Sequence, residues 1–151
     1  MKPTLVFDLE IYRDYFLAMF GNVATGNTRA FELFANHPLN MDTIRSIVAK
    51  FTLVSFNGNN FDMPLLSLAL SGADNQTIKD ASDAIILNNL RGFALERKFK
   101  FKTMTKVDHI DLIEVAPGMV SLKIYGGRLH CKKMQDLPIE PSASISVADR
   151  E

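Results

Sequence analysis

TLVFDLE, residues 4–10, is a short apolar run that ends in two carboxylates, Asp8 and Glu10. LVSFNGNNFDMPLL, residues 53–66, begins with a second apolar run, and a polar loop then leads to a third carboxylate, Asp62. Runs of strand formers bounded by polar residues predict buried strands, which places these acids at strand ends. Placing several carboxylates close together at the ends of buried strands costs free energy unless cations neutralise their charge. The two stretches therefore predict a divalent-metal site of the kind used in phosphoester chemistry.

The composition is that of one globular domain. The chain has 151 residues, of which 47% are hydrophobic and 23% charged, enough for a sizeable core. Its net charge is zero and its pI is about 6.8, so any nucleic-acid site must be a local basic patch. The single cysteine, Cys131, excludes an internal disulfide and suits a reducing compartment. No apolar run approaches the roughly 20 residues of a membrane span, so we expect a soluble, cytoplasmic protein without a signal peptide.

The order of predicted elements indicates an α/β fold. Strands are predicted over residues 4–9, 15–22, 28–34, 52–56 and 107–115. Helices are predicted over 41–50, from 61 or 62 onward, over 75–90 and over 121–130. Residues 91–106 carry no readable element. We therefore expect one domain over 1–151, with a mixed sheet of about five strands, helices on both faces, and a loop or flexible tail over 138–151.

Each acidic motif also has a plain structural interpretation. Asp8 and Glu10 lie two residues apart, so on a strand they point to the same side. They could share a metal pair, or they could be two surface acids at a strand end. Asp62 begins a predicted helix, where it could be a metal ligand or a simple N-cap. Their joint occurrence at strand ends favours the metal site.

Together these residues resemble the DEDD-type 3′→5′ exonucleases of ribonuclease H-like fold, and in particular the proofreading domains of family-B-like and phage DNA polymerases. The segment 7–10, Phe-Asp-Leu-Glu, is similar to the family's first motif, Asp-x-Glu. Residues 57–62 are similar to its second, Asn-x-x-x-Phe/Tyr-Asp, which is the more specific of the two. The segments 109–112 and 121–123 look like the strand and helix that follow it. The resemblance extends to about residue 138.

The resemblance implies a ribonuclease H-like mixed sheet and a two-metal site for Mg²⁺ or Mn²⁺. It implies that Asp8, Glu10 and Asp62 are the catalytic metal ligands. It further implies that Leu9 approaches the terminal sugar, and that Asn57 and Phe61 hold the penultimate nucleotide of a single strand.

The family's third motif, Tyr-x-x-x-Asp or His-x-x-x-x-Asp, does not occur after residue 115. His130 and Asp136 are one residue too far apart for the second form, and Asp149 has no partner at the required offset. We therefore expect a chain truncated before this motif, or a degenerate domain without the fourth acid. In either case we expect weak cleavage.

Three functional hypotheses remain open. The first is a metal-dependent 3′→5′ exonuclease acting on the 3′ end of single-stranded DNA. It would proofread for a polymerase domain in the same longer chain or complex, in the host cytoplasm if phage-encoded. The second is an inactive module of the same fold that binds nucleic acid or a partner. The third is a related ribonuclease, because the second motif does not separate DNA from RNA.

Other polar residues have weaker assignments. Asp111 is either a supporting residue behind the metal ligands or an ordinary strand-end acid. His109 is expected as a packed or hydrogen-bonded strand residue rather than a ligand. Lys123 is a candidate for substrate binding, and with Arg128, Lys132 and Lys133 it forms either a phosphate-contacting strip or a solvated helix face.

Overall fold

A computed structural model describes residues 2–118, 120–131 and 139–150. Its strands are β1 (Thr4–Ile11), β2 (Tyr15–Asn22), β3 (Thr28–Phe34), β4 (Thr52–Ser55) and β5 (His109–Asp111). Its helices are α1 (Met41–Lys50), α2 (Asp62–Leu70), α3 (Asn75–Asn88), α4 (Gly92–Phe99), α5 (Leu112–Val115) and α6 (Leu122–Arg128), with a 3₁₀ turn over Ala148–Arg150. In this described part, no helix has the length and apolar character needed to cross a membrane.

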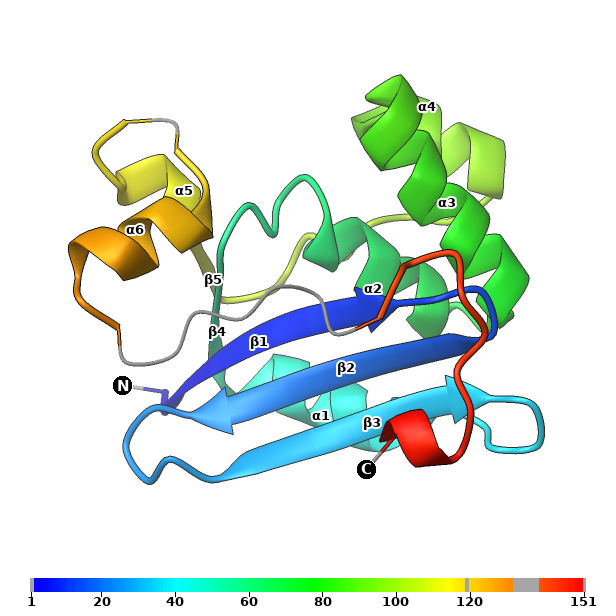
Figure 1. The fold of residues 1–151 in the computed structure, drawn as a ribbon, viewed down its shortest axis with the longest axis horizontal. Coiled ribbons are helices and arrows are strands. Elements are labelled where there is room, and N and C mark those ends of the chain that lie inside the picture. The colour runs from blue at the N-terminus through cyan, green and yellow to red at the C-terminus, as the bar shows by residue number, and fades with distance from the viewer. Residues whose placement is uncertain (1, 119, 132–138, 151) are drawn as a thin grey trace.

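The strands form one mixed sheet in the order β3-β2-β1-β4-β5 (Figure 1). β2 runs antiparallel to both β1 and β3, whereas β4 runs parallel to β1 and to β5. The parallel pairing of β1 with β4 covers Thr4 to Val6, so Asp8 and Glu10 lie beyond it. The carboxyl ends of β1, β4 and β5 therefore share one edge of the sheet, which is where α/β folds commonly hold their ligands.

One face of the sheet carries the main core. β1 alternates, so Leu5, Phe7 and Leu9 are buried while Val6 and Asp8 point to the other side. Apolar residues of α1, α2, α3 and α4 pack in the same cluster as these β1 side chains. Apart from Asp62 and Ser67, α2 consists of apolar residues, and every one of its residues is buried, as expected of a helix enclosed on all sides.

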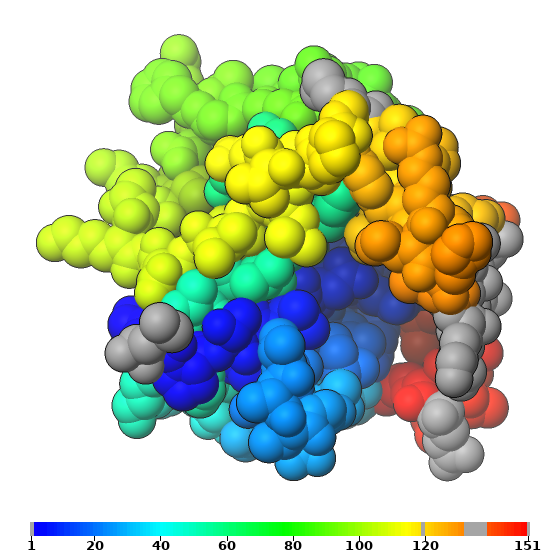
Figure 2. Space-filling view, turned by 90° about the vertical axis from the view of Figure 1, so that its left-hand side faces the viewer, coloured from blue at the N-terminus to red at the C-terminus, as the bar shows by residue number. Residues whose placement is uncertain are grey.

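The opposite face carries α6 and the C-terminal segment (Figure 2), and among the described residues part of it stays exposed. Ile139 and Ile145 of the C-terminal segment pack on Tyr12 and Tyr15 at one end of it. At the other end α6 stands over the strands, coloured orange against the blue of β1 in Figure 2. Between them Val6 remains 45% exposed. Short α6 and the tail do not bury enough apolar surface to close this face.

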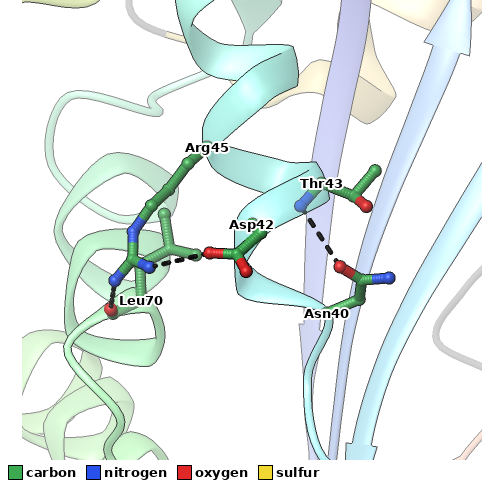
Figure 3. A network of polar contacts seen from close by, with 5 residues as sticks. All are labelled: Asn40, Asp42, Thr43, Arg45 and Leu70. Carbon is green, nitrogen blue, oxygen red and sulfur yellow. Dashed lines mark hydrogen bonds and ion pairs between the residues drawn. The ribbon is translucent and has the colours of Figure 1, made fainter.

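A polar network fixes α1 against α2 (Figure 3). The Asn40 side chain accepts a hydrogen bond from the Thr43 backbone N–H at 3.2 Å and so caps α1. Arg45 donates to the carbonyl oxygen of Leu70, the last residue of α2, at 2.7 Å and also pairs with Asp42 at 3.5 Å. Because the carbonyls at a helix end lack partners within the helix, the Arg45 guanidinium both caps α2 and ties the two helices together.

Two predicted segments differ from the structure. The strand predicted over 107–115 ends at Asp111, because the Asp111 carboxylate accepts from the Ile113 N–H at 3.2 Å and caps α5. The segment 91–106, for which no element was predicted, contains α4, which buries only Leu95. A short helix with one buried anchor leaves too weak a periodicity to be read from the sequence.

Leu66 and Leu87 offer a matched test of the core. Leu66 is fully buried in α2, whereas Leu87 of α3 is 76% exposed. We expect Leu66→Ala to lower the free energy of unfolding by about 2–5 kcal/mol, because it leaves a cavity. Leu87→Ala removes the same atoms and should cost less than about 0.5 kcal/mol. Urea denaturation measures both, and similar losses would contradict the assigned core.

Candidate active site

A cleft of about 280 Å³ opens at the carboxyl end of β1. One wall is the β1 end with Asp8 and Glu10, continuing through Tyr12, and the floor includes Phe61 at the start of α2. The other wall belongs to α3, which contributes Lys79, Ser82, Asp83 and Ile86. The cleft therefore lies where the topology brings two predicted acids beside a helix that the sequence did not associate with them.

Asp62 is a buried carboxyl group at the first position of α2. The residue is 4% exposed, and its Oδ1 is buried without a hydrogen-bond partner in the described structure. Burial and, next, the negative charge of Asp8 raise its pKa from 3.8 to about 7, while a backbone hydrogen bond from Leu9 opposes the rise. An unpartnered buried carboxylate oxygen is costly, so this group is suited to receive a proton or a cation.

Asp8 stands beside Asp62 but keeps an exposed surface. Loss of hydration raises the pKa of Asp8, a backbone hydrogen bond from Leu9 opposes the rise, and the charge of Glu10 adds to it. The backbone of Leu9 thus supports both carboxyl groups. Glu10 has a different partner, because its carboxylate accepts a hydrogen bond from the Tyr12 hydroxyl at 2.8 Å. Burial and this hydrogen bond raise the pKa of Tyr12 to about 12.

The three acids are neighbours but do not form a complete metal cage. Among the described residues, no three His, Cys, Asp or Glu side chains lie close enough to hold a metal ion. Carboxylate oxygens are nevertheless the donors that Mg²⁺ and Mn²⁺ prefer, and Asp62 Oδ1 is a donor without another partner. Asp62 and Asp8 therefore offer carboxylate donors of the kind that a divalent cation takes, whereas Glu10 is bonded to Tyr12 in this structure.

The loop before α2 is held by Asp111. This carboxylate is 3% exposed, and it accepts the backbone N–H of Asn57 at 2.7 Å and that of Asn59 at 2.8 Å. Asn57 lies in the left-handed region with φ of 62°, a conformation that costs free energy in residues other than glycine. The two bonds stabilise this turn and thereby fix where α2 begins. Asp111 is thus a supporting residue rather than an ordinary strand-end acid.

His109 completes the support of this loop. Its Nδ1 lies 3.1 Å from Asn59 Oδ1, and its Nε2 lies 2.8 Å from Ser55 Oγ. The Asn59 amide nitrogen donates to Glu114 at 2.7 Å, which turns the amide oxygen toward His109 and places the proton on Nδ1. Burial lowers the pKa of His109, against the charges of Asp111 and Glu114. The hydrogen-bonded role expected for His109 is confirmed.

Gly58 is required at the centre of this loop. A Cβ atom added there would lie 1.8 Å from Ser55 Oγ and 3.2 Å from His109 Nε2. The polar loop therefore packs its backbone directly on the ends of β4 and β5. This close approach explains why the Asn-Gly-Asn-Asn segment can carry Asp62 to the sheet edge in so few residues.

The structure places the predicted substrate residues at different distances from the cleft. Phe61 and Leu9 line it, although the Leu9 side chain is 6% exposed and belongs to the core. Asn57 lies in the supporting loop, where its side-chain oxygen accepts from Asn60 at 3.0 Å. Lys123 lies on α6 and is not among the residues that line the cleft. Lys132 and Lys133 fall outside the described residues.

Sequence reasoning missed the α3 wall. Lys79 and Asp83 form an ion pair one helical turn apart, and both line the cleft. The sequence signal was present as an i, i+4 pair on the polar side of the predicted helix, but such pairs are usually solvated. Only the packing of α3 against β1 brings this pair to the same cleft as Asp8 and Glu10.

Comparison of the chain with protein-family models, with curated proteins and with solved structures finds no match to any of them.

The raised pKa of Asp62 predicts a pH dependence of stability. Because the folded protein holds this proton up to about pH 7 and the unfolded chain releases it near pH 4, stability should fall as pH rises from 4 to 7 and then level off. The upper limit is about 4 kcal/mol, at about 1.4 kcal/mol per pKa unit. Asp62→Asn should remove this decline. Urea denaturation in the absence of metal at several pH values compares the two proteins, and parallel curves would contradict the assignment.

Asp111→Asn tests the support of the loop. An amide can accept one of the two backbone N–H groups but turns its own NH₂ toward the other, so we expect a loss of about 2–3 kcal/mol in unfolding free energy. Asp80→Asn is the matched control, because Asp80 is exposed and accepts only from the Gln76 side chain on its own helix among the hydrogen bonds of the described residues. It should change stability by less than about 0.5 kcal/mol. Equal effects of the two changes in urea denaturation would argue against a special role for Asp111.

Proposed function

We propose that this protein is a metal-dependent 3′→5′ exonuclease domain that hydrolyses the 3′ end of single-stranded DNA. The observation that carries the proposal is the buried Asp62 carboxyl group, whose Oδ1 has no partner in the described structure and whose pKa is raised by burial and by Asp8. Asp62 lies behind the cleft that Asp8 and Glu10 line, and a buried carboxyl group with a raised pKa beside a cleft is typical of a functional site.

The arrangement of the strands supports the proposal. The order β3-β2-β1-β4-β5, with β2 alone antiparallel to the other strands, is compatible with a ribonuclease H-like sheet. Asp8 and Glu10 come from the central strand, and Asp62 comes from the helix that follows its parallel neighbour. These are the positions that the two motifs hold in the family that the sequence resembles.

Asp8, Glu10 and Asp62 are the residues proposed to hold two divalent cations, Mg²⁺ or Mn²⁺. Cations bound there would activate the attacking water and stabilise the leaving 3′ oxygen. The chain itself supplies orientation: Asp111 and Gly58 fix the loop, and the Leu9 backbone supports Asp8 and Asp62. Phe61 is half-buried against the core and lines the cleft, so it would present part of its ring to a nucleotide base.

A proofreading role with a polymerase domain is the biological setting that we propose. A proofreading site must accept a frayed 3′ end and release nucleoside monophosphates. A cleft of about 280 Å³ with an aromatic residue and acids at a sheet edge suits a single strand better than a duplex.

One observation favours a second candidate, a module that binds nucleic acid without hydrolysing it. Glu10 is hydrogen-bonded to Tyr12, and the described acids do not assemble into a group of three. Because the sequence also lacks the third motif, we expect cleavage well below that of a complete exonuclease of this family.

The test is degradation of a 5′-labelled single-stranded oligonucleotide with Mg²⁺ or Mn²⁺, in parallel DNA and RNA versions. We expect slow, stepwise shortening of the DNA from its 3′ end. Asp62→Asn and Asp8→Asn should each reduce the rate at least about 100-fold, by removing a charged ligand. Asp80→Asn should have no effect.

Each alternative has its own outcome in this assay. Preferential digestion of RNA would instead assign a ribonuclease. Binding of the oligonucleotide without any shortening would assign the binding module. Activity that survives loss of both acids would refute the proposed site.

A further inference from the structure

We propose that Lys79 on α3 binds a backbone phosphate of the nucleic-acid strand that enters the cleft. The inference rests on the proposed function, since it places a strand beside Asp8. It assigns the strand's path to the wall formed by α3, whereas the sequence had placed phosphate contacts on α6, at Lys123.

Lys79 is distinguished by its position. Among the described residues that line the cleft, it is the single basic side chain, and Asp8 and Glu10 line the same cleft. Its side chain is only 12% exposed, although it carries an ammonium group. A lysine that is largely withdrawn from water at the mouth of an acidic site is held for a purpose other than solubility.

The present partner of Lys79 can be exchanged. Asp83 pairs with it from the next turn of the same helix, and the Asp83 side chain is 41% exposed. Ion pairs of this spacing on a helix stabilise it only slightly, and an exposed carboxylate can return to water. A phosphate oxygen forms a stronger charge-assisted hydrogen bond with an ammonium group. A phosphate of an entering strand can therefore replace Asp83 as the partner of Lys79.

The surroundings of Lys79 complete a strand-binding wall. Ile86, 64% exposed, lies two turns further along α3 and also lines the cleft. With Phe61 it gives two apolar surfaces near one cation, which is the combination that single-stranded nucleic acid requires: stacking for bases and positive charge for phosphates. The acids opposite repel a phosphate unless divalent cations are bound, so the strand and the cations should bind together.

Binding measurements on three variants test the inference. Fluorescence anisotropy of a labelled single-stranded DNA oligonucleotide is measured with Ca²⁺, which keeps slow hydrolysis from interfering. We expect Lys79→Met to weaken binding about tenfold. It should also reduce the slope of log affinity against log salt by about 0.7, the value for one contact to a single strand. Lys50→Met is the matched control, because Lys50 ends α1 just before β4, at the end of the sheet opposite the cleft.

Asp83→Asn separates phosphate binding from a structural ion pair. It breaks the same pair but frees Lys79, so binding should stay unchanged or become tighter. If Lys79 only stabilised α3, Lys79→Met and Asp83→Asn would weaken binding equally, and the inference would be overturned. Wild-type binding by Lys79→Met, or absence of any binding by the unmodified protein, would overturn it as well.

The result of the Lys79→Met binding test can be distinguished from the result of the hydrolysis test of the proposed function. If no strand is hydrolysed but Lys79→Met still weakens binding with the reduced salt slope, the exonuclease proposal fails and the path along α3 stands. If hydrolysis is found and Lys79→Met leaves both binding and KM unaltered, the exonuclease proposal stands and the path along α3 fails.

Discussion

The buried carboxyl group of Asp62 is the constraint on which the rest of the site depends. Placing a carboxylate at 4% exposure beside a second carboxylate, Asp8, opposes folding unless a proton or a cation is present. The backbone of Leu9 relieves only part of this cost, and Oδ1 has no partner in the described residues. The protein tolerates this locally unfavourable group because the surrounding core is extensive. Unfavourable groups that persist in this way mark functional sites.

Contacts from β5, the strand at one edge of the sheet, set the position of Asp62. β5 pairs with β4 so that Asp111 lies opposite Ser55, and from there its carboxylate holds the backbone of the loop that leads into α2. His109 and Gly58 then fill the space between the loop and the strand ends. A short third parallel strand thereby determines the geometry of a site to which it contributes no metal ligand. Such supporting contacts usually matter as much as the ligands themselves.

The charge of the molecule is arranged locally rather than globally. A chain with zero net charge can attract a polyanion only where cations, bound or built in, gather at one place. Among the described residues, the cleft has Asp8 and Glu10 on the β1 wall, and Lys79 with its partner Asp83 on the α3 wall. In the proposed function, divalent cations would convert the acidic wall into a phosphate-binding one, and Lys79 would extend it along the strand. Phosphate binding would then depend on whether the divalent cations are bound, and not on the net charge of the free protein.

The sequence by itself determined β1 and β4, whose ends carry the site, and the alternation of side chains along β1. Both follow from a local apolar pattern that is strong in these two segments. It also determined that Asp8 and Glu10 share a side. It did not locate the end of β5, since the cap formed by Asp111 competes with a strand-like pattern that continues to Val115. Only the tertiary structure decided that Asp62 is buried, that Asp111 holds its loop, and that Lys79 lines the same cleft as Asp8 and Glu10. These three properties come from the packing of segments that lie far apart in the chain, and no local pattern encodes such contacts.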